Sequence, residues 1–296
     1  HLEPKLIASN EHFNSPTSVW LDGDHYKWRA MRNFGMEEFF ISGDASDLEK
    51  FKKWSQVVPY TLRNPLFHWT HMEMNKPFGI QQYLNEKLQQ EDFTPQGLLK
   101  GFKVEALCTT DDPIDTLEYH TTIRNNGCET SVLPAFRPDN YINIVHPEQY
   151  LQSIRKLEAV CSTQIFSTDD LLNALNDRIE YFHQNDAQIS DHGFEYFPDT
   201  TLWNQELETE FSEFLKGNLN SFSNPDALSG YLLKSLCKIY SEKGWVQQFH
   251  VGATRNNNSK MLERIGVNSG YDAISDQYFT QRLSVMLDEL NSEGKL

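Results

Sequence analysis

The stretch "STDDLLNALNDRIEYFHQNDAQIS", residues 167–190, predicts an amphipathic helix that leads directly into a β-strand. Ser167 or Thr168 suits the N-cap, because a hydroxyl there accepts a hydrogen bond from an unpaired N–H of the first turn. One face of this helix carries Leu171, Leu175, Ile179 and Phe182. A helix that runs into a strand is half of a βαβ unit, which indicates a parallel sheet.

The rest of the chain repeats this alternation. Besides "AQIS" (187–190), the β-rich runs are "KVEALCTT" (103–110), "TSVLPAF" (130–136) and "WVQQFHV" (245–251). The helical pattern "PDALSGYLLKSLCKIYSEKG" ends at Gly244, a suitable C-terminal cap, and precedes the last run. The pattern "YFTQRLSVMLDEL" predicts one more helix after it. We therefore expect an α/β fold built on parallel strands.

A chain of 296 residues forms one large domain or two ordinary ones. We expect one domain over residues 1–296, with mainly helical additions at about 30–100 and 198–244. In the first addition, Asp44 begins "DASDLEKFKKW", with Asp47 three positions on as in a capping box.

The amino-acid composition limits the classes of partner that the chain is expected to bind. With 39% hydrophobic and 12% aromatic residues the chain can build a core. A net charge of −16 argues against nucleic acid or an anionic membrane surface. No apolar run is long enough for a membrane span, and "HLEPKLIASN" lacks signal-peptide features. The scattered Cys108, Cys128, Cys161 and Cys237 fit free thiols in a reducing cytoplasm.

Polar residues gather where the predicted strands end. The first run is followed by "TTDDP", the second by "RPD" (137–139), the third by "DHG" (191–193), and the fourth by His250 and then "RNNN" (255–258). In parallel α/β folds, ligands bind at the carboxyl ends of strands. We therefore expect a shared active-site rim there.

Each of these elements also has a structural interpretation. Asp112 before Pro113 suits the N-cap of a helix "PIDTLEYH". Asp191 and His192 could form a turn, and "RNNN" could be a solvated loop with left-handed asparagines. An arginine at position 137 could pair with a structural carboxylate as well as with a substrate.

Two other stretches carry unusual residues. "DHYKWRAMR" (24–32) places a histidine, a tyrosine and several cations together, as either a solvated turn or a pocket wall. His68 and His71 have the spacing of metal ligands on a helix. Trp69 and Met72 beside them favour helix packing instead.

Seven segments together resemble the uronate isomerase family. In chain order they are "GDHYKWRAMR", "GDASD", "NPLFHWTHMEMNKPFGI", "TTDDPIDTLEYH", "LPAFRPD", "ISDHG" and "WVQQFHVGATRNNN". This family belongs to the amidohydrolase superfamily of metal-dependent (β/α)₈ barrels. The resemblance implies a (β/α)₈ TIM-type barrel, incomplete here, that binds a divalent metal, expected to be zinc.

The chain departs from the family pattern at its ends. Family members hold the metal with a His-x-His pair, and His1 aligns with the second histidine of that pair. The family also continues past "NSEGKL" into further strands that supply an aspartate and an arginine. We therefore expect this chain to be part of a longer enzyme with an incomplete metal site.

The resemblance implies interconversion of D-glucuronate with D-fructuronate, and of D-galacturonate with D-tagaturonate. Such an isomerase needs a group that moves a proton between C2 and C1, and a cation for the carboxylate. By resemblance, His25, Tyr26, Asp191 and His250 are catalytic, Arg137, Arg255 and His192 bind substrate, and His1 binds the metal. A cytoplasmic homo-oligomer is expected.

Two other functions remain open. One is an amidohydrolase-type metallohydrolase that uses a metal-activated water. The other is a non-catalytic sugar-acid binding protein. Arg29 and Arg32 of the "DHYKWRAMR" stretch are expected to support the wall that carries His25 and Tyr26.

Overall fold

The computed structural model describes residues 3–74, 80–276 and 279–296. The chain forms two compact units, each described here by itself. The helical unit comprises residues 1–105, 125–130 and 254–273, and the sheet unit comprises residues 106–124, 131–253 and 274–296. The predicted single domain over residues 1–296 stays a prediction.

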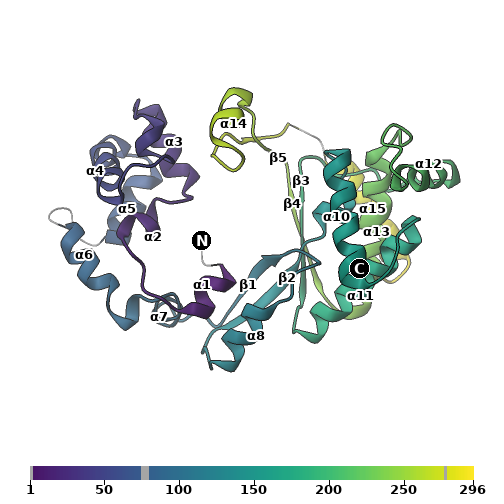
Figure 1. Ribbon diagram of the computed structural model, residues 1–296, viewed down its shortest axis with the longest axis horizontal. Coiled ribbons are helices and arrows are strands. Elements are labelled where there is room, and N and C mark those ends of the chain that lie inside the picture. The colour runs from purple at the N-terminus through teal and green to yellow at the C-terminus, as the bar shows by residue number, and fades with distance from the viewer. Residues whose placement is uncertain (1–2, 75–79, 277–278) are drawn as a thin grey trace. The chain divides into compact units, whose positions relative to one another are not determined.

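The sheet unit is built on four parallel strands. They are β1 (Ala106–Asp111), β2 (Ser131–Phe136), β3 (Ile189–Phe194) and β4 (Val246–Val251). Their spatial order, β1-β2-β3-β4, equals their order in the chain, and each neighbouring pair is parallel (Figure 1). This is the strand order of a (β/α)₈ barrel. The predicted α/β class is confirmed.

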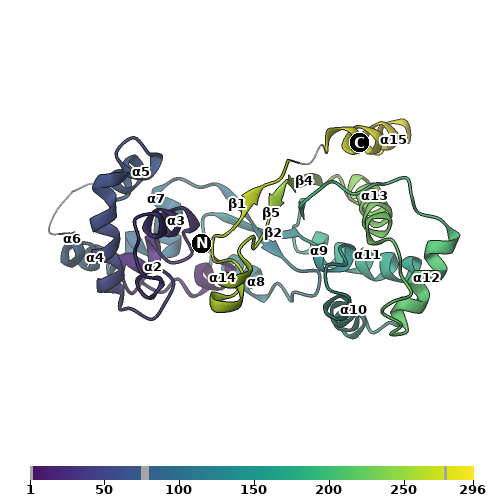
Figure 2. The same cartoon turned by 90° about the horizontal axis from the view of Figure 1, so that it is seen from above.

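Helices connect these strands. They are α8 (Glu118–Asn125), α9 (Asp139–Ile142), α10 (Pro147–Cys161), α11 (Thr168–Gln184), α12 (Gln205–Leu215) and α13 (Pro225–Lys243). A further helix, α15 (Thr280–Ser292), comes after the last strand in the chain. Figure 1 shows α10, α11 and α13 on one side of the sheet. α15 lies beside α13 (Figure 2), where Met286 and Leu290 join the core.

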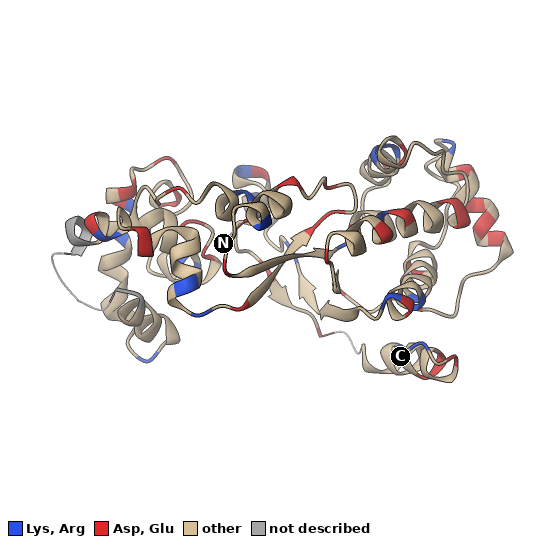
Figure 3. Cartoon of the chain, turned by 90° about the horizontal axis from the view of Figure 1, so that it is seen from below, with Lys and Arg blue, Asp and Glu red and all other residues tan. Residues whose placement is uncertain are grey.

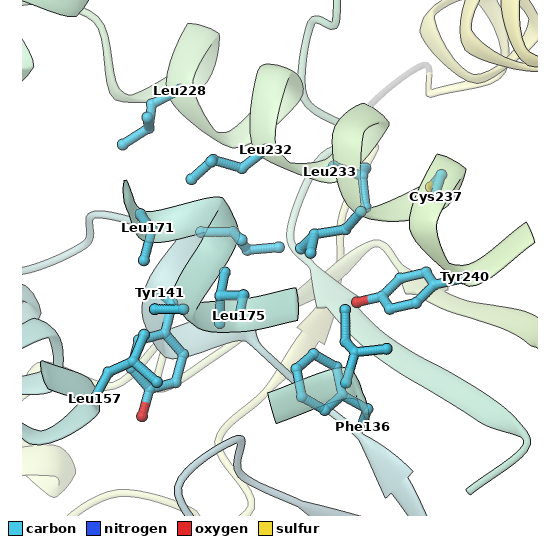
Figure 4. Packing of buried hydrophobic residues seen from close by; sticks show 14 of the residues in the cluster. Phe136, Tyr141, Leu157, Leu171, Leu175, Leu228, Leu232, Leu233, Cys237 and Tyr240 are labelled. Atoms are coloured by element: carbon cyan, nitrogen blue, oxygen red, sulfur yellow. The ribbon is translucent and has the colours of Figure 1, made fainter. Parts of the chain in front are cut away.

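The main core lies between the sheet and these helices. Figure 4 shows leucines of α11 and α13 facing Phe136 of β2 and Tyr240 of α13. The Phe136 ring meets Phe182 edge to face at 5.1 Å between centroids, and Tyr240 stacks on Trp245 at 5.7 Å. This packing fixes one face of the sheet.

The helical unit contains many short helices. They are α1 (Pro4–Ser9), α2 (Pro16–Trp20), α3 (His25–Asn33), η1 (Glu38–Phe40), α4 (Asp47–Val57), η2 (Val58–Thr61), α5 (Pro65–Met74), α6 (Ile80–Leu88), η3 (Glu91–Phe93), α7 (Pro95–Gly101) and α14 (Ser259–Ile265). A smaller core here includes Met31, Ile41 and Trp54. Short strands β5 (Ala253–Thr254) and β6 (Ala273–Ile274) form a separate two-stranded sheet.

Several predicted caps are confirmed. Ser167 is the N-cap of α11, and its side chain accepts a hydrogen bond from the Asp170 N–H. α13 ends at Gly244, whose φ of 69° is left-handed and therefore favours glycine. In the "RNNN" loop Asn256 is left-handed, as one interpretation predicted.

Three interpretations offered by the sequence differ from the structure. Asp191 and His192 do not form a turn, because β3 continues through them to Phe194. Asp112 does not cap a helix, since the next helix begins only at Glu118. The N-cap of α4 is Ser46, which forms a capping box with Glu49, and not Asp44.

Two further features concern the cysteines and the helices. All four cysteines are free. In the part of the chain that the structure describes, no helix is long and apolar enough to cross a membrane. Figure 3 shows that acidic residues are spread over both units, in keeping with the net charge of −16.

Candidate active site

Asp191 is the centre of a polar cluster in the sheet unit. Its side chain is only 7% exposed. Its Oδ2 accepts hydrogen bonds from Arg137 Nη1 and Thr110 Oγ1, both at 3.2 Å, and its Oδ1 lies 3.0 Å from His250 Nε2. Three predicted site residues, Arg137, Asp191 and His250, therefore meet in one place.

The sheet places these residues together. Arg137 directly follows β2, and its N–H donates to the Asp111 carbonyl at the end of β1. Asp191 lies in β3 and His250 near the end of β4. Because the strands are parallel, their carboxyl ends share one edge of the sheet. The predicted rim at this edge thus brings together side chains that are far apart in sequence.

Arg137 lies between two carboxylates. Its Nε donates to Asp139 Oδ2 at 2.8 Å, while Nη1 donates to Asp191. Burial alone would lower the pKa of Arg137, but the hydrogen bond and charge of Asp139 and the charge of Asp191 outweigh it and raise the pKa. The guanidinium therefore stays charged, and Nη2 has no hydrogen-bond partner among the described residues.

His250 is the exposed member of the cluster. Its side chain is 56% exposed, whereas the Asp191 carboxylate beside it is almost covered. Gln248 Nε2 also lies 2.7 Å from His250 Nε2. A buried carboxylate close to an imidazole stabilises the positive charge that the ring acquires when it takes up a proton. This pair is the strongest acid–base candidate in the sheet unit.

His192 has a different environment. Its side chain is fully buried and packs against Phe194, Tyr240 and Phe249 at 5.7 to 5.8 Å between ring centroids. Burial, followed by the charge of Arg137, lowers its pKa to about 3. Within the described part of the chain, neither ring nitrogen has a hydrogen-bond partner. His192 has no exposed surface in this structure, and its predicted substrate-binding role stays a prediction.

A second polar group lies at the end of β1. Thr109 Oγ1 donates to Asp111 Oδ2 at 2.6 Å and lies 2.8 Å from His120 Nε2. Burial raises the pKa of Asp111 to about 6 and lowers that of His120 to about 4. Since Asp111 and His120 are almost wholly buried, this group supports the strand end rather than offering groups to a ligand.

In the helical unit, His25 and Tyr26 form the first turn of α3. The Asp24 carboxylate caps this helix by accepting from the N–H groups of Tyr26 and Lys27. The Tyr26 side chain is 65% exposed, and the His25 ring stacks on Trp28 at 5.5 Å. The "DHYKWRAMR" stretch is therefore a capped helix start and not a solvated turn.

Arg255 is the other predicted cation. It is 58% exposed, and its Nη1 donates to Asp272 Oδ2 at 3.0 Å. Burial would raise the pKa of Asp272, but the Asn256 N–H, Arg255 and His25 together lower it. The helical unit thus brings His25 and Arg255 to one carboxylate.

Arg29 and Arg32 connect α3 to the segment that contains Asp272. Arg29 donates to the carbonyls of Gly270 and Asp272 at 2.8 and 2.9 Å. Arg32 binds Glu38 through two nitrogens and also donates to the Ser269 carbonyl. These contacts agree with the supporting role predicted for both arginines. They border an open hollow of about 500 Å³.

The described residues do not form a ready metal site. Among them, no group of three or more His, Cys, Asp and Glu side chains is arranged to hold an ion. The predicted ligand His1 lies outside the described residues. His68 and His71 are both exposed on α5, where His71 Nδ1 contacts the Phe67 carbonyl at 2.6 Å. A metal centre here remains a proposal.

Sequence patterns alone do not single out three residues of these clusters. Asp139 was visible only as part of "RPD", Thr110 only as part of "TTDDP", and Asp272 carried no motif. Thr110 lies on β1, close to the polar residues that follow this strand, and its position could have indicated it. No local pattern indicated Asp272, because its contacts come from α3 and the "RNNN" loop.

Comparison with known proteins shows which family this chain belongs to. The family model described as glucuronate isomerase matches residues 1–296. The chain belongs to this family. Among curated relatives, the uronate isomerase of Bacteroides fragilis is 41% identical over 100% of this chain and 66% of its own length. That of Caldanaerobacter subterraneus subsp. tengcongensis is 42% identical with the same coverage. The chain therefore spans slightly less than two thirds of the length of these two relatives.

Solved structures of the family share the fold. The crystal structure of uronate isomerase from Thermotoga maritima has a TM-score of 0.88 and 28% identity, over 100% of this chain and 67% of that chain. Glucuronate isomerase from Caulobacter crescentus also has a TM-score of 0.88, at 24% identity, over 100% of this chain and 65% of that chain. The latter supports the fold alone. The TIM-like fold expected from the resemblance is thus confirmed.

Proposed function

We propose that this protein is an aldose–ketose isomerase that interconverts D-glucuronate with D-fructuronate and D-galacturonate with D-tagaturonate in uronate catabolism. Family membership indicates the reaction. The observation that carries the proposal is the cluster of Arg137, Asp191 and His250, which combines a fixed cation with an acid–base pair.

The reaction has two chemical requirements. A proton leaves C2 of the aldose and returns at C1, while the carbonyl moves from C1 to C2. The intermediate carries negative charge on oxygen, so the site must handle a carbon-bound proton and stabilise this charge. The uronate carboxylate must also be held while the proton moves.

Asp191 and His250 suit the proton transfer. His250 is the proposed proton acceptor, and its Nε2 lies 3.0 Å from Asp191 Oδ1. The carboxylate then stabilises the imidazolium that forms, and the same proton can return to the neighbouring carbon. Because His250 is exposed and Asp191 is covered, only the imidazole is positioned to touch a substrate.

Arg137 suits the carboxylate. Its Nε and Nη1 are held by Asp139 and Asp191, which fixes the plane of the guanidinium. Nη2 remains available as a charged donor, and charge-assisted hydrogen bonds to carboxylates are among the strongest in proteins. Arg255, which pairs with Asp272, is proposed as a second substrate-binding cation.

His25 and Tyr26 are proposed as further catalytic residues. The support is their match to the family motif "GDHYKWRAMR" and the exposure of the Tyr26 ring at the start of α3. A phenol or an imidazole can donate to sugar hydroxyls or assist proton transfer.

A divalent metal, zinc in the first instance, is proposed on the resemblance alone. The described residues do not supply three clustered ligands, so no step above is assigned to it. A homo-oligomeric state is proposed on the same ground, and light scattering after size-exclusion chromatography tests it. Four free cysteines support a reducing, cytoplasmic location.

Substrate comparison tests the proposed class of reaction. The full-length protein is incubated with D-glucuronate and D-galacturonate, and separately with the corresponding lactones and amides. Formation of ketose from the uronates is expected. Hydrolysis of lactone or amide without any ketose would instead support a metallohydrolase, and binding without turnover would support a sugar-acid binding protein.

A further inference from the structure

The chain beyond β2 continues alongside β3 without belonging to the sheet. The last paired residues of the two strands are Phe136 and Ser190. Three residues further along β3, the Gly193 N–H lies beyond the residues that pair with β2. Instead it donates to Asp139 Oδ2 at 3.0 Å. A side-chain carboxylate therefore replaces the backbone carbonyl that the ended strand no longer supplies.

The same carboxylate oxygen also holds Arg137. Arg137 Nε lies 2.8 Å from Asp139 Oδ2, so this oxygen accepts from the guanidinium and from the backbone of β3 together. Asp191 Oδ2 holds the guanidinium at Nη1. Two carboxylates thus fix two of its three nitrogens and leave Nη2 in a defined direction.

Gly193 makes room for this arrangement. A Cβ atom added at Gly193 would lie 2.2 Å from Arg137 Nη2 and 3.2 Å from Asp139 Oδ2. The first distance is far inside van der Waals contact. Gly193 does not have a positive φ, so the requirement for glycine here comes from space and not from backbone conformation. The guanidinium therefore lies directly against the backbone of β3.

Asp139 is also held at an energetic cost. Its side chain is 21% exposed, and its buried Oδ1 has no hydrogen-bond partner among the residues that the structure describes. Nδ1 of the buried His192 is 3.8 Å from this oxygen, which is beyond hydrogen-bond distance. An unsatisfied carboxylate oxygen is uncommon in a native structure and calls for an explanation. Holding Arg137 supplies one.

We propose that Asp139 and Gly193 are positioning residues for Arg137. Asp139 orients the guanidinium through Nε, and Gly193 lets it lie against β3, so that Nη2 faces the substrate carboxylate. Together they set the affinity of the site for the anionic end of a uronate. The inference rests on the proposed isomerase function, because the ligand of Nη2 is the uronate carboxylate.

The test measures KM and kcat for D-glucuronate in the full-length protein. We expect Asp139→Asn and Gly193→Ala each to raise KM at least about tenfold, which corresponds to about 1.4 kcal/mol of binding. We expect kcat to change much less, because Asp191 and His250 stay in place. The thermal midpoint is recorded for every variant, and Asp139→Asn keeps the shape of the side chain in case Gly193→Ala does not fold.

Matched controls separate positioning from general stability. Asp226→Asn removes a carboxylate of similar exposure that pairs with Arg282, and Gly101→Ala adds a methyl group with nothing within 4 Å. Both controls should leave KM unchanged. A further readout is selectivity: D-glucuronamide, which lacks the charge, should compete with glucuronate better in Asp139→Asn than in the wild type.

The outcomes are distinct. A selective rise in KM with lost preference for the charged ligand supports the inference. An unchanged KM in Asp139→Asn, or a lowered thermal midpoint with normal KM, overturns it and makes Asp139 structural. A wild-type protein that does not isomerise uronates would remove the proposed function itself, and this inference with it.

Discussion

At the scale of single residues, the proposed role of Arg137 sets two opposing demands. It must be held rigidly, and it must keep part of its guanidinium for a ligand. Arginine meets both, because its planar group has several donors pointing in fixed directions. Asp139 and Asp191 occupy two of the nitrogens and Nη2 remains. Lysine carries its donors on a single nitrogen and lacks the fixed planar geometry of the guanidinium.

Arg137→Lys is therefore expected to lower kcat/KM for D-glucuronate at least about tenfold, or about 1.4 kcal/mol. Steady-state kinetics give this value. Arg282→Lys, at another Asp–Arg pair in the same unit, is the control and should have normal kinetics. Equal kinetics for Arg137→Lys and the wild type would remove Arg137 from the site.

The hydroxyl group of Tyr26 can be tested by a substitution that removes it alone. Its ring is 65% exposed, and its hydroxyl has no hydrogen bond within the described part of the chain. Tyr26→Phe should thus leave the thermal midpoint unchanged and reduce kcat about tenfold or more. Tyr60→Phe, at a tyrosine that is 75% exposed, should change neither value. A lower midpoint with normal turnover would show that Tyr26 is structural.

His192 connects stability with pH. Its pKa is about 3 in the folded protein because of burial, against 6.5 for an ordinary histidine. Below pH 6.5 the unfolded chain binds a proton that the folded chain does not, so the free energy of unfolding falls as pH decreases. From pH 7 to pH 4 this amounts to roughly 3 kcal/mol at about 1.4 kcal/mol per pH unit.

His192→Phe should remove this part of the pH dependence. Because neither ring nitrogen of His192 is satisfied, the substitution should not destabilise the protein at pH 7. Urea unfolding at pH 7, 5.5 and 4 measures the effect. His146→Phe, at an exposed histidine, should keep the wild-type slope, and an unchanged slope in His192→Phe would show that the ring is hydrated.

At the scale of the elements, local chemistry explains which parts of the fold could be predicted. Ser167 and Gly244 have their effect within one helical turn, so their positions could be read from the sequence. The end of β3 could not, because Asp191 is typical of turns and its partners Arg137 and His250 come from other strands.

The contacts of Asp112 could likewise not be predicted from the local sequence. The pair Asp112–Pro113 matches a helix start, but the Asp112 carboxylate accepts from Tyr141 Oη at 2.7 Å and from Asn140 Nδ2 at 2.8 Å. These donors follow β2 and are remote in sequence. Side chains that depend on a second strand or loop, such as Asp139 and Asp272, were therefore not singled out before the structure.

The N-cap of α11 provides a test at this scale. Ser167→Ala removes the acceptor for the Asp170 N–H and should lower the free energy of unfolding by about 1 kcal/mol. Chemical denaturation measures it. Ser153→Ala, inside α10, should leave stability equal or slightly higher, since alanine favours helices. Equal stability of both variants would mean that the cap is replaced by water.

At the scale of the whole molecule, the negative net charge opposes the binding of the proposed anionic substrate. A net charge of −16 repels an anionic uronate at long range. The two proposed substrate-binding cations, Arg137 and Arg255, are each paired with carboxylates. Affinity must therefore come from short, directed hydrogen bonds rather than from a broad positive field. This makes the geometry at the carboxyl edge of the sheet the decisive feature.

The most direct test is the rate of ketose formation by the full-length protein and by its Asp191→Asn variant. Conversion of D-glucuronate to D-fructuronate is followed by NMR under identical conditions. The wild type should form fructuronate, and Asp191→Asn should be at least about a hundredfold slower, because a proton-transfer pair has lost its charge. Equal rates for the two proteins, or no ketose from the wild type, would contradict the account.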